Sequence, residues 1–493
     1  MGHAYSSIIA DFFARFKKID GFKVNFLTGT DEHGLKIQRA AEVKGIDPLK
    51  FCDEISLTFK DLSKTLNLTN TDFIRTTESR HKKSVQNLWK VLEKNNEIYL
   101  SKYSGWYSVS DEAFYSEDEI ETSDDKKISK TSGSIVEWVK EESFFFKLSK
   151  WQDPLLKFYE ENPKFILPES RKNEVLSFVK NGLKDLSISR KSFTWGIKVP
   201  SKNNHVIYVW LDALTNYLSA LNYPNVNDNL YKKFWPADLH LIGKDILRFH
   251  AIYWPAFLLA ANIPPPKRVY GHGWILSGEE KMSKSKGNIL DPIEIIDKYG
   301  LDPLRYYLLK EVSFGNDGSI SKEKLENSIN SDLANNYGNF CQRVTAFVEK
   351  NLSLKVPQEY HFENDDMKIL NIYEKNFENI INFIDDQNIN NYLNFIQDQL
   401  FSANKYFNDQ EPWKKKKDLK RLNTILYVSL ELIRKISIML YPIIPGTSLK
   451  VLEIFKIKEK DININSIRIH DNLKKNDKLD KISMLFKKIE KND

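Results

Sequence analysis

Apolar residues at the start of the chain repeat with the period of an α-helix. They recur at three- and four-residue intervals from Ile8 to Phe16, so one face of a helix would carry all of them. Gly21 follows as a helix stop. The pattern predicts an amphipathic helix that begins almost at the first residue.

Three short apolar runs predict buried strands, and each is followed by a helical pattern. They are Val24–Thr28, His205–Trp210 and Asp238–Gly243. Strands that alternate with helices indicate an α/β fold with a parallel sheet. The last strand leads into a long helix from Lys244, in which Pro255 predicts a kink.

Residues 95–192 interrupt this α/β pattern. They are rich in aromatic, charged and turn-forming residues, and their short extended segments predict an inserted mixed β domain. Within it we expect Glu121–Lys130 to be an exposed loop. The two halves of the α/β domain would then be residues 1–94 and 193–280.

Strand patterns end at about Ser321, and amphipathic helical patterns follow. Asp332–Lys350, Met367–Phe383 and Leu419–Leu440 are the longest, and together they predict a helical bundle. We therefore assign residues 326–493 to a helical domain with a C-terminal tail. Residues 281–325 would form a lysine-loop and stem-contact region, which includes a capped helix between Asp291 and Gly300.

Composition narrows the function without identifying it. The net charge of +6, from 73 basic and 67 acidic residues, is too small to indicate a nucleic-acid partner. Cys52 and Cys341 are far apart and outside any Cys-x-x-Cys motif, so we expect neither disulfides nor structural zinc. No apolar run is long enough to span a bilayer. These observations predict a cytoplasmic protein without a membrane partner.

Polar and aromatic residues follow the predicted strands where parallel sheets bind ligands. Asp31 is a candidate for holding a substrate ammonium group, although it could equally be the N-cap of the next helix. Trp210, Ala213 and Tyr217 are spaced to form an aromatic wall on one helix face, or an ordinary core stripe. His250 lies four residues after Ile246 and could face the same ligand.

The segment Lys281-Met282-Ser283-Lys284-Ser285 carries the most specific chemistry. Two lysines among small residues, followed by Gly287, could bring mobile ammonium groups to a triphosphate. A bare Lys-x-x-Lys is more often a solvated basic turn, but this full string with its flanks is far rarer. It resembles the signature loop of the class I aminoacyl-tRNA synthetases.

The similarity is closest to the methionyl-tRNA synthetase family and covers nearly the whole chain. The matching motifs are Leu27–Gly34, Trp106–Phe114, Trp210–Ala213, Ile242–Ile246, the lysine segment, and Asn339–Arg343 with Pro412–Trp413. The resemblance implies a Rossmann-like nucleotide-binding domain with an inserted connective domain, followed by an all-α anticodon-binding bundle. It also implies ATP-dependent attachment of methionine to tRNA(Met) through methionyl-adenylate, with release of AMP and pyrophosphate.

The resemblance assigns roles residue by residue. ATP, with Mg²⁺, would be bound by Gly2, His3, Gly271, His272, Lys281 and Lys284, of which His3, Lys281 and Lys284 would be catalytic. Methionine would be bound by Asp31, Trp210, Ala213, Leu214, Tyr217, Ile246 and His250. The tRNA anticodon would be contacted by Asn339, Arg343 and Trp413, beside four lysines at 414–417, although that run could simply be a solvated helix start.

The chain also departs from the family pattern. Gly2-His3 resembles the second half of a His-x-Gly-His element whose first half, with the first strand, is missing. We expect a misplaced start or a truncated record, because a sheet without its central strand leaves backbone groups unpaired. Zinc-binding cysteines are absent, and no dimerisation domain follows the bundle, so we expect a monomer. The resemblance implies no DNA partner.

Three other interpretations fit some of these features. A leucine, isoleucine or valine synthetase would share the fold, but the insertion of about 98 residues leaves little room for a large editing domain. A truncated chain could bind tRNA and activate nothing. A generic nucleotidyltransferase would not explain the helical bundle or the tryptophan–lysine segment.

Overall fold

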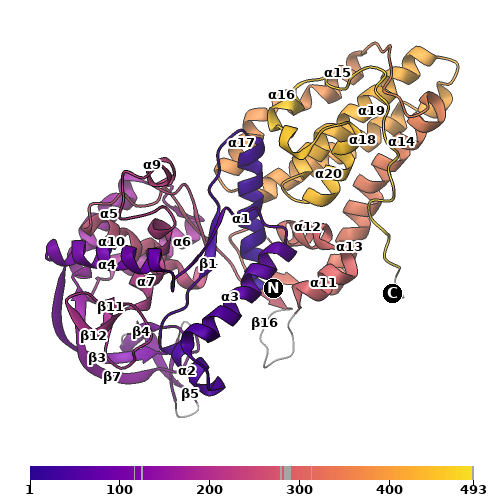
Figure 1. Cartoon of the computed structure of the whole chain (residues 1–493). Coiled ribbons are helices and arrows are strands. Elements are labelled where there is room, and N and C mark those ends of the chain that lie inside the picture. The colour runs from indigo at the N-terminus through magenta and orange to yellow at the C-terminus, as the bar shows by residue number, and fades with distance from the viewer. Residues whose placement is uncertain are drawn as a thin grey trace. The chain divides into compact units, whose positions relative to one another are not determined.

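The computed structural model describes residues 1–490 except 116, 124–125, 131, 278–279, 282–289 and 313. The chain forms two compact units, whose elements Figure 1 labels. Residues 25–272 form one, which we call the sheet unit, and residues 1–24 with 273–493 form the other, which we call the helical unit. The amino-terminal helix therefore belongs to the same unit as the carboxyl-terminal half of the chain. The finer domain boundaries given above stay predictions.

Parallel strands connected through helices form the nucleotide-fold part of the sheet unit. β1 (Leu27–Thr30) pairs with β2 (Asp72–Arg75), while β14 (Val269–His272) lies between β13 (His240–Gly243) and β8 (Ile166–Leu167). Parallel pairing requires crossover connections, as the alternation of strands and helices predicted. The helices of this unit are α2 (Leu35–Lys44), α3 (Pro48–Thr65), α4 (Ser79–Lys94), α5 (Gln152–Glu161), α6 (Glu169–Lys180), α7 (Val209–Leu214), α8 (Asn216–Ser219), α9 (Asn229–Phe234) and α10 (Trp254–Ala260).

Antiparallel strands form the inserted part of the sheet unit. β3 (Ile98–Ser108) pairs along its length with β7 (Glu137–Phe146), and β4 (Ala113–Tyr115) and β9 (Leu186–Ser187) flank them. The stretch predicted to be an exposed loop instead contains a hairpin of β5 (Ile120–Ser123) and β6 (Lys126–Ser129). Its alternation was hidden because most of these side chains are charged or small.

The segment after β13 differs from the single kinked helix that Pro255 suggested. A 3₁₀ turn (Lys244–Ile246) and a π-helical turn (Phe249–Tyr253) precede α10. Pro255 lies in the first turn of α10, where a missing backbone N–H costs no hydrogen bond. The irregularity therefore lies before the proline, and the predicted position of the kink was wrong. π-turns of this kind occur frequently at functional sites.

The predicted amino-terminal helix is confirmed as α1 (Gly2–Ile19) in the helical unit. A buried ion pair anchors it: the Asp11 carboxylate accepts hydrogen bonds from Arg15 Nε and Arg305 Nη2, each at 2.7 Å. Arg305 belongs to α12 (Leu301–Glu311) and also donates to the Ile443 carbonyl oxygen. The five apolar residues of the predicted face are all buried: Ile8, Ile9, Phe12, Phe13 and Phe16.

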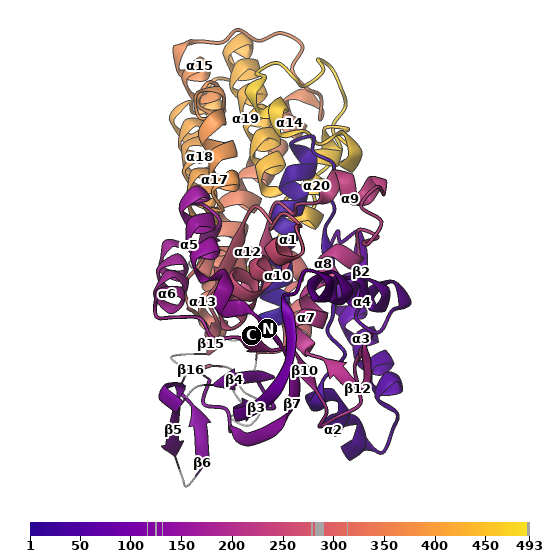
Figure 2. The ribbon, with the colours of Figure 1, turned by 90° about the vertical axis from the view of Figure 1, so that its left-hand side faces the viewer.

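Helices dominate the helical unit as far as Ile454, and no strand follows β17 (Gly318–Ile320) in the described part of the chain. Figure 2 shows α17, α18 and α19 side by side. The predicted helix Leu419–Leu440 is α19, with those bounds. The helices are α11 (Pro292–Tyr299), α13 (Lys322–Ser328), a π-helical segment (Ile329–Gly338), α14 (Asn339–Leu352), α15 (Asn364–Leu370), α16 (Ile372–Lys375), α17 (Phe377–Asp385), α18 (Ile389–Asp409) and α20 (Pro445–Ile454).

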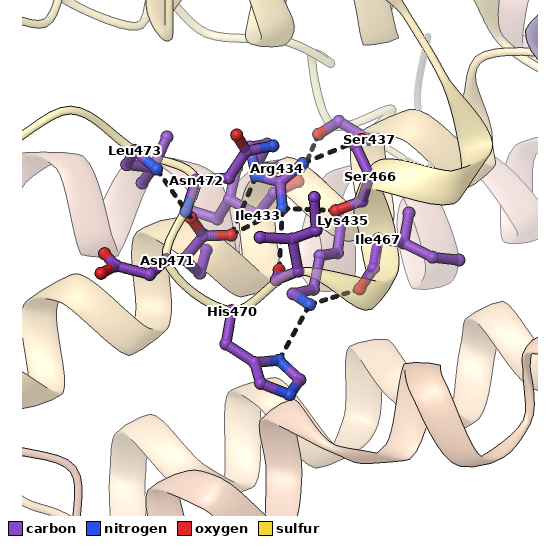
Figure 3. A network of polar contacts seen from close by, with 12 residues as sticks. Ile433, Arg434, Lys435, Ser437, Ser466, Ile467, His470, Asp471, Asn472 and Leu473 are labelled. Carbon is purple, nitrogen blue, oxygen red and sulfur yellow. Dashed lines mark hydrogen bonds and ion pairs between the residues drawn. The ribbon is translucent and has the colours of Figure 1, made fainter.

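A buried polar network fastens the tail of the chain to α19 (Figure 3). Glu431 pairs with Arg434 at 2.8 Å and accepts the backbone N–H groups of Asn472 and Leu473, each at 3.0 Å. Lys435 Nζ donates to the Ile467 carbonyl oxygen. Glu431 and Arg434 are therefore buried as an ion pair, while burial lowers the pKa of Lys435 to about 7.

No helix in the described residues has both the length and the apolar character needed to cross a membrane.

Candidate active site

The polar motif after β1 places Asp31 at the carboxyl end of a parallel strand. The next helix, α2, has Gly34 as its N-cap, with a φ of 111° that favours glycine. Asp31 therefore does not cap this helix, and that alternative was wrong. Its carboxylate remains available for a ligand at the edge where open α/β sheets bind them.

Asp31 is accessible to solvent, yet protein atoms surround it closely. Desolvation, followed by the nearby Asp212 carboxylate, raises the pKa of Asp31 to about 6. His81 and His33 act in the opposite direction. An ammonium ligand would stabilise the charged carboxylate, so this environment suits a cation-binding group.

Glu32 anchors the motif on one side of Asp31. It is buried, and its carboxylate accepts hydrogen bonds from Arg75 Nε at 2.7 Å and from the Thr77 hydroxyl at 2.5 Å. The Trp195 indole donates to the Glu32 carbonyl oxygen at 2.6 Å. These bonds hold the backbone next to Asp31 from two directions.

His33 anchors the motif on the other side. His33 Nδ1 lies 2.7 Å from Asp212 Oδ2, and His81 Nε2 lies 2.6 Å from Asp212 Oδ1. All three side chains are buried. Burial alone would raise the pKa of Asp212, but His33 and His81 lower it to about 2. Asp212 is therefore a buried carboxylate held in its charged form.

The predicted aromatic wall is assembled from three segments. β12 (Lys202–Ile207) ends before the predicted strand end, so Trp210 lies in the first turn of α7. Its ring stacks on Phe249, with centroids 3.8 Å apart and planes 6° from parallel. Ala213 and Leu214 are buried on the same short helix. Thr215 separates α7 from α8, which carries Tyr217. The rings of Trp210 and Tyr217 both lie near His250, with centroid distances of 6.3 and 5.8 Å.

Tyr217, His250 and Ile246 are linked by hydrogen bonds. The Tyr217 hydroxyl lies 2.8 Å from His250 Nε2, and His250 Nδ1 lies 3.0 Å from the Ile246 carbonyl oxygen. Burial lowers the pKa of His250 to about 4, so the ring is neutral, with Nδ1 donating and Nε2 accepting. Burial, and after it the Asp31 carboxylate, raises the pKa of Tyr217. The charge of Asp31 therefore influences the Tyr217 side chain of the aromatic wall.

The predicted ATP-binding residues lie on both units. Gly2 and His3 are exposed in the first turn of α1, and Gly271 and His272 are buried at the end of β14. Lys281 ends β16 (Glu280–Lys281), which pairs with β15 (Ile275–Ser277). The Lys281 side chain and the whole of Lys284 lie outside the described residues.

The predicted anticodon residues lie in the helical unit. Asn339 and Arg343 are on α14. Arg343 Nη2 donates to Asn408 Oδ1 at 2.5 Å, near the end of α18. Trp413 is 41% exposed in a 3₁₀ turn (Pro412–Lys414), which is separate from α19. The arrangement leaves Trp413 accessible to a partner, although no described contact joins it to Asn339 or Arg343.

Residue types alone did not identify the network around Asp212. His33 and Asp212 lie within recognised motifs, and their positions beside Asp31 and Trp210 were the available signal. The sequence carried no signal for His81, because a lone histidine on an amphipathic helix is usually structural. Among the described residues no group of three or more His, Cys, Asp or Glu side chains is arranged to hold a metal ion.

Family models match most of the chain. Residues 1–345 match tRNA synthetases class I (M), and residues 356–493 match the anticodon binding domain of methionyl tRNA ligase. The chain is 52% identical over 465 residues to the methionine–tRNA ligase of Rickettsia felis, covering 94% of this chain and 90% of that protein. The corresponding enzyme of Brucella suis is 49% identical over 458 residues, covering 93% and 89%.

Solved structures agree with the family models. The structure of Mycobacterium tuberculosis methionyl-tRNA synthetase in complex with methionyl-adenylate has a TM-score of 0.96 and 43% identity, covering 98% of this chain and 96% of that one. The predicted fold class and family are confirmed, which disfavours the leucine, isoleucine and valine synthetases and a generic nucleotidyltransferase. With its accessible Asp31 beside an aromatic group in a class I fold, the chain belongs to the methionyl-tRNA synthetase family.

Proposed function

We propose that this protein activates methionine with ATP and transfers it to tRNA(Met). The observation that carries the proposal is the accessible Asp31 carboxylate at the end of β1, electrostatically coupled to the group of Tyr217 and His250. The ammonium group of methionine would pair with the Asp31 carboxylate, and its polarizable thioether would pack against Tyr217 and His250. The family membership supplies the reaction.

Asp31 would bind the methionine ammonium group, and the aromatic residues would enclose its side chain. Trp210 is stacked flat on Phe249, and turning its ring would break that contact. A missing methylene in an apolar site is worth only about 1–3 kcal/mol. Selectivity therefore needs contacts that close around the sulfur, for which Ala213, Leu214, Ile246 and the linked pair Tyr217–His250 are placed.

The activation step needs positioning and charge stabilisation more than a protein nucleophile. The methionine carboxylate attacks the α-phosphate of ATP, and pyrophosphate leaves with Mg²⁺. We assign His3, Lys281 and Lys284 to the charge that develops on the phosphate oxygens, and Gly2, Gly271 and His272 to the nucleotide. The adenylate is then attacked by a hydroxyl of the terminal ribose of tRNA.

We assign Asn339, Arg343 and Trp413 to the anticodon. Bases of a single-stranded loop are bound by stacking on aromatic side chains and by side-chain hydrogen bonds. Trp413 is exposed and followed by four lysines, which supports this assignment. The cytoplasmic location and the monomeric state stay predictions; light scattering of the purified protein would check the second.

Methionine-dependent exchange of pyrophosphate into ATP tests the proposal. Lys284→Ala should slow exchange strongly and leave tRNA affinity nearly unchanged, since the lysine is assigned to phosphate charge. Lys267→Ala is the matched control, because Lys267 is exposed and pairs only with the exposed Asp238 among the described residues. Wild-type protein that binds tRNA but shows no exchange would instead be a binding protein without activation activity. Equal loss of exchange and tRNA affinity in Lys284→Ala would contradict the role of the lysine.

A further inference from the structure

The buried network around Asp212 reaches four separate segments of the sheet unit. Asp212 on α7 pairs with His33 after β1 and with His81 on α4. His81 Nδ1 in turn lies 3.0 Å from the Ser219 hydroxyl on α8. His33 and Asp212 are 179 residues apart in sequence, so their contact joins the two halves of the α/β domain.

The same segments carry residues assigned to methionine. Asp31 lies two positions before His33, Trp210 and Ala213 flank Asp212, and Tyr217 lies two positions before Ser219. Each of these four residues is therefore within two positions of a member of the network. A shift of any member would displace the ammonium-binding carboxylate relative to the aromatic wall.

We propose that Asp212, His33 and His81 are positioning residues that hold the ammonium-binding and side-chain-binding parts of the methionine site in register. The inference rests on the proposed function, because it assumes that Asp31 and Trp210 contact methionine. None of the three needs to touch the substrate, since all are buried while Asp31 is accessible.

Both ring nitrogens of His81 have partners. Nε2 faces the Asp212 carboxylate, which can only accept, so Nε2 carries a hydrogen and donates it. Nδ1 faces the Ser219 hydroxyl, which also lies 2.9 Å from the Thr215 carbonyl oxygen. These contacts fix the orientation of the His81 ring relative to Asp212.

The network around Asp212 acts on the pKa of Asp31 as well as holding its backbone. The charged or titratable groups that act on Asp31 are Asp212, His81, His33 and Glu32, and Asp31 in turn acts on Glu112 and Tyr217. Asp212 raises the pKa of Asp31, and His81 lowers it. Removing the charge of Asp212 should therefore lower the pKa of Asp31, and removing His81 should raise it.

Steady-state pyrophosphate exchange tests the positioning role. His33→Ala should raise the KM for methionine by about 10- to 100-fold, as expected for a misplaced binding group, while the KM for ATP stays within about twofold. His33→Asn offers an amide N–H close to the position of Nδ1 and should recover most of the loss. His205→Gln is the matched control, because His205 is a buried histidine of the same unit that bonds Ser189 and Glu142 instead.

The pH dependence of kcat/KM for methionine separates positioning from a purely structural role. His81→Gln keeps an amide N–H towards Asp212 but removes the group that lowers the pKa of Asp31, so the acid limb should move to higher pH. Asp212→Asn removes the negative charge, so the acid limb should move to lower pH. Thermal unfolding of each variant would show which are folded at the assay temperature.

The possible results separate this inference from the proposed function. Absence of methionine-dependent exchange in the wild type would contradict the proposed function itself. Wild-type exchange with an unchanged methionine KM in folded His33→Ala would overturn the positioning role. Equal rises in both KM values, or acid limbs that move in the same direction in His81→Gln and Asp212→Asn, would also overturn it.

Discussion

The buried networks around Asp212 in the sheet unit and around Glu431 in the helical unit both bury charged side chains, with different residues. In the sheet unit, Asp212 is paired with two histidines. In the helical unit, Glu431 is paired with an arginine and with backbone N–H groups. Buried charges are costly unless each has a partner and its remaining hydrogen bonds are made, and both networks meet that condition.

The difference lies in the cation and in what surrounds it. Arginine stays charged at all relevant pH values, so the network on α19 is insensitive to pH on the arginine side and fastens the tail. Histidine changes charge near neutral pH, and the network around Asp212 adjoins the accessible Asp31. The comparison teaches that the two networks differ in their neighbours. The network around Asp212 adjoins a carboxylate that a ligand can reach, whereas the network on α19, in which burial lowers the pKa of Lys435 to about 7, fastens the tail.

Breaking the network of the helical unit should have the largest effect on stability. Glu431→Gln leaves the buried Arg434 without its counter-charge, so the free energy of unfolding should fall by about 3–5 kcal/mol. Urea unfolding would measure the change. Glu374→Gln is the control, because the Glu374–Arg468 pair is half-exposed and solvent-exposed pairs contribute little to stability. Similar losses in both variants would contradict the special cost of burial.

Removing the accessible carboxylate of the sheet unit should affect activity instead of stability. Asp31→Asn deletes a charged partner of the ammonium group, so kcat/KM for methionine should fall about 100-fold, equivalent to about 2.7 kcal/mol. The KM for ATP should change little. Asp238→Asn changes an exposed aspartate of the same unit and should retain activity. Retention of full exchange activity by Asp31→Asn would remove the basis for the methionine site.

Replacing Trp413 tests whether the helical unit binds tRNA through this side chain. If a base stacks on its ring, Trp413→Ala should weaken tRNA binding by about 1–3 kcal/mol and leave pyrophosphate exchange unchanged. Filter binding or fluorescence anisotropy would measure the affinity. Trp138→Ala alters another exposed tryptophan, in the sheet unit, and serves as the control. Unchanged tRNA binding and charging in Trp413→Ala would end the anticodon assignment.

The smallest expected effect is on the pH dependence of stability. The pKa of Asp31 in the folded protein is about 6, above its ordinary value of 3.8, so protonation favours the folded state. The stabilisation is present below about pH 4 and is lost as the pH rises through about 6. Because Asp31 is accessible, we expect a change of less than about 1 kcal/mol.

Unfolding midpoints of the wild type and Asp31→Asn, measured from pH 4 to 7, would check the direction. The wild type should lose stability relative to the variant as the pH rises, provided that both stay folded over this range. A gain in relative stability would show that Asp31 has a favourable cationic neighbour in the free protein.

Local sequence signals determined the features that depend on near neighbours. The apolar period of α1, the bounds of α19, and the helix between Asp291 and Gly300 all follow from spacing and end signals. Asp291 accepts a hydrogen bond from the Ile293 N–H, and Gly300 ends the helix with a φ of 91°. The sequence likewise placed Asp31 directly after its strand, because a strand and the loop after it are contiguous in sequence, whereas Trp210 lies in the first turn of α7 and not at the end of β12.

Only the tertiary structure decided which distant groups meet. The sequence does not show that His33, His81 and Asp212 share one network, that the Tyr217 hydroxyl bonds His250, or that α1 folds with residues 273–493. The sequence also predicted a kink at Pro255, whereas the irregularity is the π-helical turn before it. Such a turn depends on the packing of its side chains more than on a helix-breaking residue. Hydrogen bonds between buried charges are set by how whole elements pack, and local periodicity carries no information about that.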